Sequence, residues 1–472
     1  MTAKSAAALP PRLAMDDPLS LNKVGSARSL EGLHGSIAVP HSAAGFWRHW
    51  RAFVGPAFLV SVGYMDPGNW ATDLKAGAAF RYELLWVVAL SSLMAIVLQV
   101  IAARLGVVTG KDLAQACRDY YWPWTRWPLW IACEVAIGAC DLAEVLGSAI
   151  AITLLFPHIG LLTAVFITAF DVLLLLALQG LGMRFIEAVI LVLVGTIGGC
   201  YFIELFVLPQ VQPDFAEMGQ ALMTPGFRQE GMIMVAIGII GATVMPHNLY
   251  LHSALVQSRQ LRADESFVRR AIKFNTIDTV AALSVAFLVN AGILVLAAMV
   301  FHKQIEFDED TDWIKVAYFT LSPLLGTALA STLFAVALLA SGQSSTITGT
   351  LAGQVVMEGF MHWRVRPWVR RFMTRLLAII PAIIVIGVYG DENVTDMLIV
   401  SQVVLAFQLP FAMIPLMHFT STRSRMGNHA NGWLLLCAGW TSCILITALA
   451  VYGILEYFGL TDAFDEALKG MI

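Results

Sequence analysis

The chain has 472 residues, of which 58% are hydrophobic and only 13% are charged, and its mean hydropathy is +0.74. Soluble domains are usually about 45–50% apolar and about 25% charged, so this composition excludes an ordinary soluble protein and indicates a chain that lies mostly in lipid. The net charge is −4 and no basic stripe is present, so no nucleic-acid partner is expected.

The first 46 residues are polar to mixed in composition and include Pro10 and Pro11. They lack the short apolar core and the small-residue cleavage site of a signal peptide. We therefore expect residues 1–46 to form a disordered cytosolic tail. Residues 47–472 are expected to form a single transmembrane domain, because no later linker is long enough to separate two domains.

Long apolar runs follow the tail. A helix needs roughly 20 apolar residues to cross the hydrocarbon core of a bilayer, whereas the strands of a β-barrel would be short alternating segments, which the sequence does not contain. The pattern predicts an all-α polytopic membrane protein with eleven transmembrane helices. They lie at about 52–80, 84–107, 128–155, 159–178, 184–208, 231–257, 274–301, 321–345, 376–390, 395–418 and 431–457.

Lysine and arginine are distributed unevenly between the loops. Cytoplasmic loops carry the excess of these residues in membrane proteins. With the N-terminus inside, 23 of the 29 Lys and Arg residues fall on the cytoplasmic side. This bias predicts a multi-pass protein of the bacterial inner (plasma) membrane, with a cytoplasmic N-terminus and, because the number of spans is odd, an external C-terminus.

The first predicted span is interrupted near its middle by residues 66–69 (Asp-Pro-Gly-Asn). Proline removes a backbone donor and clashes with the preceding turn. The carbonyls that it frees must face protein or a water-filled cavity rather than lipid. An acidic residue beside such a break is costly in a membrane, so the segment is a candidate functional site.

The sixth predicted span has a similar interruption at residues 245–248 (Met-Pro-His-Asn). The pattern x-Pro-x-Asn therefore recurs at the same position in two halves of five spans, about 52–208 and about 231–418, which are followed by an extra helix at about 431–457. Because five is odd, the halves are inverted in the membrane. Such inverted repeats are typical of transporters whose broken helices meet at the cargo near the bilayer midplane. The alternative is that both prolines only kink their helices.

The two interruptions carry metal-ligand chemistry. Asp66 offers a carboxylate, Asn69 an amide oxygen and Met245 a thioether, with backbone carbonyls near Ala242 and Asp66. A thioether adds nothing for Mg²⁺ or Ca²⁺, but it suits Mn²⁺, Fe²⁺ and softer ions such as Cd²⁺. The sequence therefore favours a divalent transition metal as the cargo, with Met245 as the discriminating residue. The alternative role of Met245 is core packing.

The third predicted span carries Glu134, Asp141 and Glu144. At 100° per residue, Asp141 lies about 20° and Glu144 about 80° from Glu134, so the three acids share one face. Three buried acids on one face cannot all stay ionised without cations, and a proton relay needs such groups. Arg375, at the cytoplasmic mouth of the ninth span, is a candidate partner for the inner member, Glu134. The alternative is a set of static contacts between helices.

Two further positions are weaker candidates. His252 lies seven residues after Met245 and so shares its helix face, where it is a candidate to sense or pass protons. A structural imidazole is the alternative. Gln402 and Gln408 on the tenth span are candidates to complete the metal shell, and Gln402 is the favoured one.

Several motifs together resemble those of the Nramp metal transporters. They are residues 66–69, residues 245–248 with the following Leu-Tyr-Leu-His-Ser-Ala-Leu-Val-Gln, residues 342–350 (Gly-Gln-Ser-Ser-Thr-Ile-Thr-Gly-Thr), residues 141–144 and residues 408–412. The resemblance covers essentially the whole chain beyond the tail. It implies a leucine-transporter-like fold, uptake of divalent metal ions into the cytosol and co-transport of protons.

The resemblance also implies roles for single residues. Asp66, Asn69 and Met245 match the metal ligands of the family, together with the carbonyl of Ala242, and a network that includes Arg375 is supported. Nramp-like magnesium transporters are similar but lack the motif methionine, so Met245 favours the manganese and iron branch. Lys75 and Arg81 depart from the usual, less basic pattern near the first break.

The sequence therefore predicts a proton-coupled importer of Mn²⁺ or Fe²⁺, and also of Cd²⁺ and Co²⁺, that works by alternating access. A proton would travel from Asp66 along the third-span acids to the cytosol. Neither enzymatic activity nor a resident cofactor is expected, and no obligate protein partner is implied beyond the metal ion, the proton and the bilayer. Two alternatives stay open, a magnesium transporter of the same type and an organic-substrate symporter on the same fold.

Overall fold

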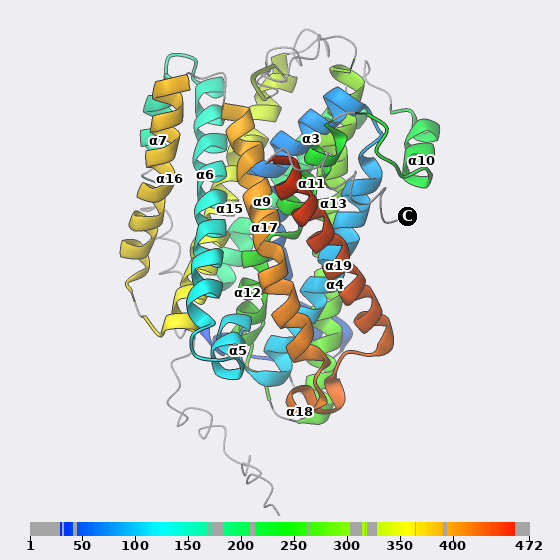
Figure 1. Cartoon of the computed structure of the whole chain (residues 1–472), viewed down its shortest axis with the longest axis vertical. Coiled ribbons are helices and arrows are strands. Elements are labelled where there is room, and N and C mark those ends of the chain that lie inside the picture. The colour runs from blue at the N-terminus through cyan, green and yellow to red at the C-terminus, as the bar shows by residue number, and fades with distance from the viewer. Residues whose placement is uncertain are drawn as a thin grey trace, which may run out of the picture.

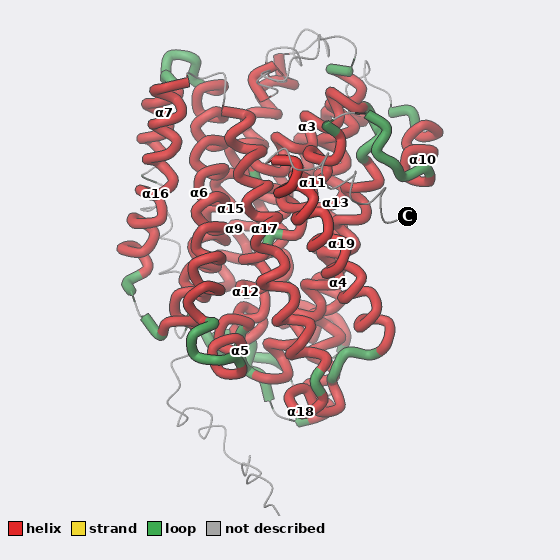
Figure 2. Tube along the Cα trace, viewed as in Figure 1, coloured by secondary structure: helices red, strands yellow, loops and turns green. Residues whose placement is uncertain are grey.

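The long apolar runs become helices in the structure, a computed structural model in which the predicted all-α class is confirmed. Figure 2 shows helices running along the long axis of the molecule. Among the described residues there is no β-strand, and one isolated parallel bridge joins Ile37 and Arg259. The structure describes residues 29–30, 33–40, 45–168, 170, 183–207, 213–229, 231–262, 264–302, 314–316, 318, 328–363, 365–389 and 394–457.

The structure describes the following helices in chain order. They are α1 (Phe46–Phe53), α2 (Pro56–Ser61), α3 (Pro67–Phe80), α4 (Leu85–Thr109), α5 (Leu113–Tyr120), α6 (Arg126–Leu155), α7 (Leu161–Thr168), α9 (Met183–Phe202), α10 (Phe215–Met223), α11 (Met232–Val244), α12 (Pro246–Leu255), α13 (Glu265–Val300), α15 (Ala328–Met361), α16 (Pro367–Tyr389), α17 (Val394–Ser421), α18 (Arg423–Met426) and α19 (Trp433–Tyr457). Short 3-10 turns lie at Gly63–Met65, Val256–Ser258 and Gly427–His429, and a π-turn lies at Ile203–Val207.

Eight helical segments within the described residues are long and apolar enough to cross a membrane, by length and composition. The remaining three predicted spans are shorter or incompletely described. The first is split, with a short apolar piece at Pro56–Met65; the ninth has one at Phe372–Ile384; and of the fourth, α7 is the helix described. The total of eleven spans therefore stays a prediction.

The long helices surround the two interrupted ones. α6 packs along α15 and α17, while α13 packs along α3 and α4. In Figure 1, α11 and α12 lie one above the other in the middle of this bundle. The outer faces of several helices expose large apolar side chains, including Val192, Leu288, Leu377 and Ile444. An apolar outer surface of this kind is expected where lipid surrounds the protein.

Residues 33–40, which belong to the expected N-terminal tail, contact the transmembrane domain. The N–H groups of Gly35 and Ile37 donate to the carbonyls of Gln257 and Ser258 at 3.1 and 3.0 Å, and the Gln260 N–H donates back to the Ile37 carbonyl at 2.9 Å. The segment of residues 33–40 therefore lies against the chain that follows α12. Residues 1–28 lie outside the described residues.

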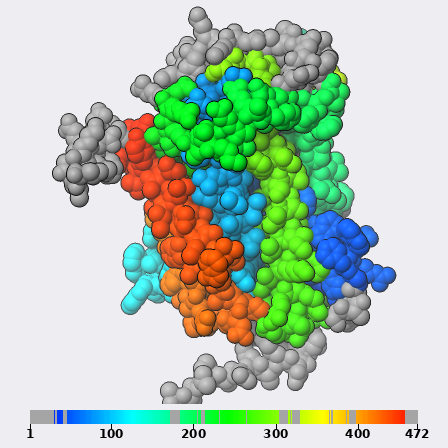
Figure 3. Space-filling view, turned by 90° about the vertical axis from the view of Figure 1, so that its right-hand side faces the viewer, coloured from blue at the N-terminus to red at the C-terminus, as the bar shows by residue number. Residues whose placement is uncertain are grey.

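Arg81, one of the two unusual basic residues, has a structural contact at the end of α3. It has a φ of 56°, in the left-handed region, and its guanidinium pairs with Glu217 of α10 at 2.8 Å. Figure 3 shows the α10 region lying across one end of the helix bundle. Arg81 therefore ties the end of α3 to α10.

Candidate functional site

Both predicted interruptions are present in the structure. The first helix passes from α2 through the 3-10 turn Gly63–Met65 and restarts as α3 at Pro67. In the second, α11 ends at Val244 and α12 begins at Pro246. Each proline stands at the first position of its new helix, where its missing N–H leaves no bond unmade.

The two prolines free one carbonyl each. In an α-helix the carbonyl of residue i accepts from the N–H of residue i+4. The partners that the carbonyls of Gly63 and Ala242 would have are Pro67 and Pro246, which carry no N–H. The Gly63 carbonyl accepts instead from the Asp66 N–H at 3.4 Å, and each carbonyl keeps a lone pair for a side chain or a cation. The two carbonyls belong to opposite halves of the repeat.

Asn69 joins the two halves. Its Nδ2 donates to the Ala242 carbonyl at 3.1 Å and to the Gly63 carbonyl at 3.5 Å. The same nitrogen donates to Oδ1 of Asp66 at 2.7 Å. On its other side, Asn69 Oδ1 accepts from Nδ2 of Asn290 on α13 at 3.3 Å. The Asn69 amide nitrogen therefore contacts a carboxylate and both carbonyls, whereas Oδ1, the predicted ligand atom, faces Asn290.

Asp66 is fully buried at the start of α3. Its Oδ1 caps the helix by accepting from the Asn69 backbone N–H at 2.8 Å. Its Oδ2 has no hydrogen-bond partner within the described ranges. A buried carboxylate oxygen without a partner is costly. Asp66 thus has one oxygen that orders the break and one that remains available to a ligand.

Met245 occupies a strained position between α11 and α12. Its φ of 29° and ψ of 105° are unusual for a residue with a side chain, and such strain costs about 1–3 kcal/mol and is common at functional sites. Its Sδ accepts from Asn248 Nδ2 at 3.4 Å. Its side chain packs against Cys140 of α6 and Leu405 of α17. Packing and ligation are therefore both open to this residue.

The first break approaches Met245 at Gly63. A Cβ atom added to Gly63 would lie 3.3 Å from Met245 Sδ and would overlap Asn248 Nδ2. Glycine is needed here because a larger residue would push the two breaks apart. The sulfur of the second break therefore lies beside the turn that leads into Asp66.

Gln402 of α17 lies over the first break. A Cβ atom on Gly68 would overlap the Gln402 amide group. Gln402 Nε2 donates to Ser401 Oγ at 2.8 Å, while Oε1 is buried and has no hydrogen-bond partner among the residues that the structure describes. The favoured glutamine is thus beside the segment from Asp66 to Asn69.

The candidate metal ligands at the two breaks include only one acidic side chain. No group of three His, Cys, Asp or Glu side chains suited to a metal ion occurs in the described part of the chain. A cation at this junction would therefore depend on one carboxylate, neutral oxygens and a thioether. The C-terminal end of α11, which carries the negative end of the helix dipole, adds favourable potential for a cation.

Glu134 and Glu144, two of the three third-span acids, each pair with an arginine of α16. Nη2 of Arg370 contacts both carboxylate oxygens of Glu134, at 3.0 and 2.9 Å. Arg375 pairs with Glu144, with Nη1 3.8 Å from Oε2 and both side chains buried. The expected pairing of Arg375 with Glu134 is therefore wrong. Five residues of helix rise by about 7.5 Å, which separates the two arginines by enough to serve different acids.

Asp141 and Glu144 lie at the contact between α6 and α15. Thr346 Oγ1 donates to Glu144 Oε2 at 3.0 Å. A Cβ atom on Gly349 would lie 2.9 Å from Glu144 Oε1 and 3.4 Å from Asp141 Oδ1. Cys140 Sγ donates to Glu144 Oε1 at 3.8 Å and belongs to the same small apolar cluster as Met245 and Leu405. A single residue therefore separates the second break from the acids.

His252 belongs to a different polar chain. Its Nδ1 lies 2.9 Å from Oε1 of Gln99, and Gln99 Nε2 donates to the Tyr64 hydroxyl at 2.7 Å. Tyr64 is part of the turn that precedes Asp66. The structure thus connects His252 to the first break through Gln99 of α4.

Three buried polar residues near the breaks were missed by sequence reasoning: Gln99, Asn290 and Asp73. Gln99 and Asn290 are polar residues within apolar spans, a signal that could have found them. Asp73 lies seven residues after Asp66 on α3, and so about 20° from it around the helix. Which neighbours these residues meet could not be read from their spacing.

Known proteins resemble this chain over most of its length. The family model described as natural resistance-associated macrophage protein-like matches residues 57–456. A divalent metal cation transporter MntH from a Nostoc species is 50% identical over 430 residues, which cover 91% of this chain and 96% of the relative. A transporter of the same description from Bradyrhizobium diazoefficiens is 51% identical over 428 residues, which cover 90% and 94%.

Solved structures agree with this similarity. The Eremococcus coleocola manganese transporter, in complex with an aromatic bis-isothiourea substituted compound, is 39% identical, with a TM-score of 0.81 and 92% of each chain covered. Mhp1, a nucleobase-cation-symport-1 family transporter, is 12% identical, with a TM-score of 0.58 over 86% of this chain and 94% of Mhp1. The second likeness concerns the fold alone. The predicted leucine-transporter-like fold is confirmed.

Proposed function

The chain belongs to the natural resistance-associated macrophage protein-like (Nramp) family of membrane transporters, and on this basis we propose that it imports divalent transition metal ions, chiefly Mn²⁺ or Fe²⁺, together with protons. Its relatives are named divalent metal cation transporters, and a structural neighbour is a manganese transporter. The protein is thus a multi-pass transporter rather than an enzyme.

One observation carries the proposed cargo. The Asn69 amide contacts Asp66 and the freed carbonyls of both breaks, and the Met245 thioether lies beside the first of these breaks. A single carboxylate, neutral oxygens and a sulfur form a ligand set that suits Mn²⁺, Fe²⁺, Co²⁺ and Cd²⁺ better than Mg²⁺ or Ca²⁺. Gln402 supplies a further amide oxygen when the metal ion is enclosed.

The proposed proton route begins at Asp66 and continues along α6. Cys140 connects Met245 with Glu144, which supports a short distance between the cargo and the acids. Asp141, Glu144 and Glu134 then lead the proton toward the cytosol, with Arg375 as a counter-charge for Glu144. His252 serves the same route from the side of the first break, through Gln99 and Tyr64.

The proposed orientation places the N-terminus in the cytoplasm and the C-terminus outside, in the plasma membrane. Under this orientation α3 and α11 are the outer halves of the broken helices, and α2 and α12 are the inner halves. Rocking of the broken helices against the α6 and α15 pair would open the site to each side in turn.

Transport in liposomes tests the proposal directly. Purified protein is reconstituted with a metal-sensitive dye and a pH-sensitive dye inside, and Mn²⁺ is added outside. We expect metal entry together with acidification of the lumen, and little competition from Mg²⁺. Metal entry without acidification would remove proton coupling. Equal competition by Mg²⁺ would favour the magnesium alternative, and the absence of any metal flux would favour an organic substrate.

Gly63→Ala is expected to lower the initial rate of Mn²⁺ uptake at least about tenfold, which corresponds to about 1.4 kcal/mol. The added methyl group would overlap Asn248 and crowd Met245, so the two sets of donors would separate. Initial rates in liposomes measure the effect. Gly138→Ala on α6 is the matched control, because a Cβ atom there meets nothing within 4 Å. Equal rates for the two variants would contradict the close approach of the breaks.

A further inference from the structure

The helix α1 precedes the first span and exposes both aromatic and basic side chains. The aromatic side chains of Phe46 and Trp47 are 50% and 69% exposed. At 100° per residue, Arg51 and Arg48 lie about 140° and 160° from Phe46, whereas Trp47 lies only about 40° from Arg51. A short helix that exposes both aromatic side chains and arginines is suited to the surface of a membrane, where rings and basic groups lie at the level of the head groups.

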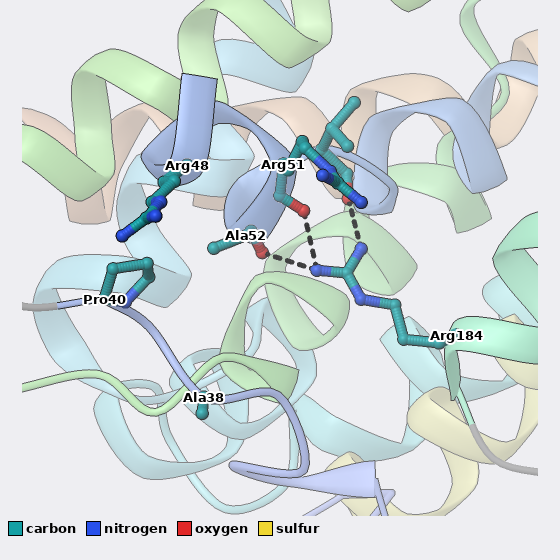
Figure 4. A pocket seen from close by; sticks show the side chains of 7 residues that line it. Ala38, Pro40, Arg48, Arg51, Ala52 and Arg184 are labelled. Carbon is teal, nitrogen blue, oxygen red and sulfur yellow. Dashed lines mark hydrogen bonds between the residues drawn. The ribbon is translucent and has the colours of Figure 1, made fainter. Parts of the chain in front are cut away.

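A cavity of about 550 Å³ opens beside α1 (Figure 4). Three arginines line it, Arg48 and Arg51 from α1 and Arg184 from the first turn of α9. Ala38, Pro40, Ala52 and Val54 complete the lining. Figure 4 shows Arg48 and Arg184 on two sides of the cavity, with the backbone of Arg51 and Ala52 between them. We call this feature the arginine cavity.

The arginine cavity has an excess of positive charge. Arg184 is already engaged, because its Nη1 pairs with Glu187 at 2.9 Å and its Nη2 donates to the carbonyls of Arg51 and Ala52 at 2.8 and 3.1 Å. Glu187 also pairs with the buried Arg259 at 2.9 Å. Across the described residues, no acidic side chain pairs with Arg48 or Arg51. Within the described part of the chain, these two charges are therefore available to an anion.

We propose that the arginine cavity binds the phosphate of an anionic phospholipid head group. Guanidinium groups match the geometry of phosphate oxygens, and basic pockets between helices on the cytoplasmic side bind such head groups. Free phosphate shares this chemistry, but it has no acyl chains to meet Phe46 and Trp47. Figure 3 shows the N-terminal region at the surface beside α13, and Phe46 contacts Phe274 of that helix with ring centroids 5.4 Å apart.

The position of the cavity gives the lipid a role in transport. Arg184, which lines the cavity, donates to the carbonyls of Ala52 and Val54 at 3.1 and 3.0 Å, and the buried Arg259 donates to the same carbonyls at 3.2 and 2.7 Å. The chain just before α2 is therefore held by these two arginines. A lipid bound there would steady the inner half of the first broken helix and so alter the rate at which it moves. This consequence rests on the proposed function, whereas lipid binding itself does not.

Lipid binding is tested on the full-length protein in detergent, with native mass spectrometry to measure the apparent Kd for phosphatidylglycerol and for phosphatidylcholine. We expect preference for phosphatidylglycerol. Because each arginine near an anionic head group contributes about 1 kcal/mol, the double variant R48A/R51A should bind phosphatidylglycerol roughly 30-fold more weakly. The double variant R262A/R269A removes the same charge from exposed positions that do not line the cavity, and it should bind as the parent does.

Three results would overturn the proposal. The first is equal affinity of R48A/R51A and R262A/R269A for phosphatidylglycerol, and the second is equal affinity of the parent for the two lipids. The third is displacement of the lipid by inorganic phosphate, tested up to 10 mM, with an apparent affinity similar to that of the lipid. The third would assign the cavity to free phosphate. Arg48 and Arg51 are exposed, so their replacement should not disturb folding. The single variant R48A provides a second measurement, with an expected loss of about fivefold in affinity for phosphatidylglycerol. A parent protein that binds the lipid without transporting metal would contradict the proposed function alone.

Discussion

Asp66→Ala is expected to lower the initial rate of Mn²⁺ uptake at least about 100-fold, which corresponds to about 2.7 kcal/mol. Asp66 supplies the negative charge of the proposed ligand set. Its Oδ1 also accepts a hydrogen bond from the side chain of Asn69 at 2.7 Å. The variant would therefore lose a metal ligand and also the group that orients Asn69. Uptake in liposomes and calorimetric binding of Mn²⁺ measure the two effects.

Asp66→Asn separates charge from helix capping. The asparagine oxygen can still accept from the Asn69 N–H, so the start of α3 should be preserved, whereas the charge is lost. We expect uptake to fall nearly as far as in Asp66→Ala. Asp119→Asn, at a carboxylate on α5 paired with Lys111 at 2.7 Å, is the control for the loss of one acid and should transport normally. Normal uptake by Asp66→Asn would mean that Asp66 acts only as a helix cap.

Met245→Ala is expected to change which ions compete rather than to abolish uptake. We expect Mn²⁺ uptake to fall no more than about tenfold, and inhibition by Ca²⁺ or Mg²⁺ to become at least about tenfold stronger. The physical reason is that the thioether is a poor ligand for hard ions, and its removal leaves oxygen donors alone. Competition assays with Mn²⁺ as the transported ion measure the ranking.

Two companion variants distinguish ligation from packing at this position. Met245→Leu keeps an apolar side chain of similar volume against Cys140 and Leu405 but removes the sulfur, so its ion ranking should follow that of Met245→Ala. Met94→Ala, at another buried methionine on α4, should leave the ranking unchanged. If Met245→Leu ranks ions as the parent does, the residue is a packing element and the preference for transition metals has another source.

The interruptions could be predicted because their causes are local. Pro67 and Pro246 lack the N–H that a continuous helix needs, and an acid or a polar residue beside each proline marks a site that lipid cannot surround. The same reasoning led to the prediction that Asp66, Asn69 and Met245 are ligands. Spacing along one helix also placed Asp141 and Glu144 on a shared buried face, which the structure bears out at their contact with α15.

Contacts between helices could not be predicted in the same way. Either Arg370 or Arg375 could pair with an acid on α6. The position of α16 along α6 decides that Arg370 pairs with Glu134 and Arg375 with Glu144. Asn290 meets the first break from α13, far away in the chain, and Gln99 meets it from the next helix, α4; no spacing rule connects either residue to the break.

The sequence by itself determined the apolar runs, the positions of the two breaks and the chemical types of the donors, because hydropathy, helix periodicity and the missing N–H of proline act within a few residues. Only the tertiary structure decided that one Asn69 amide reaches the carbonyls of both halves and that three arginines gather beside α1. These arrangements depend on the packing of helices distant in the chain, and packing is set by the shapes of both partners rather than by either sequence segment alone.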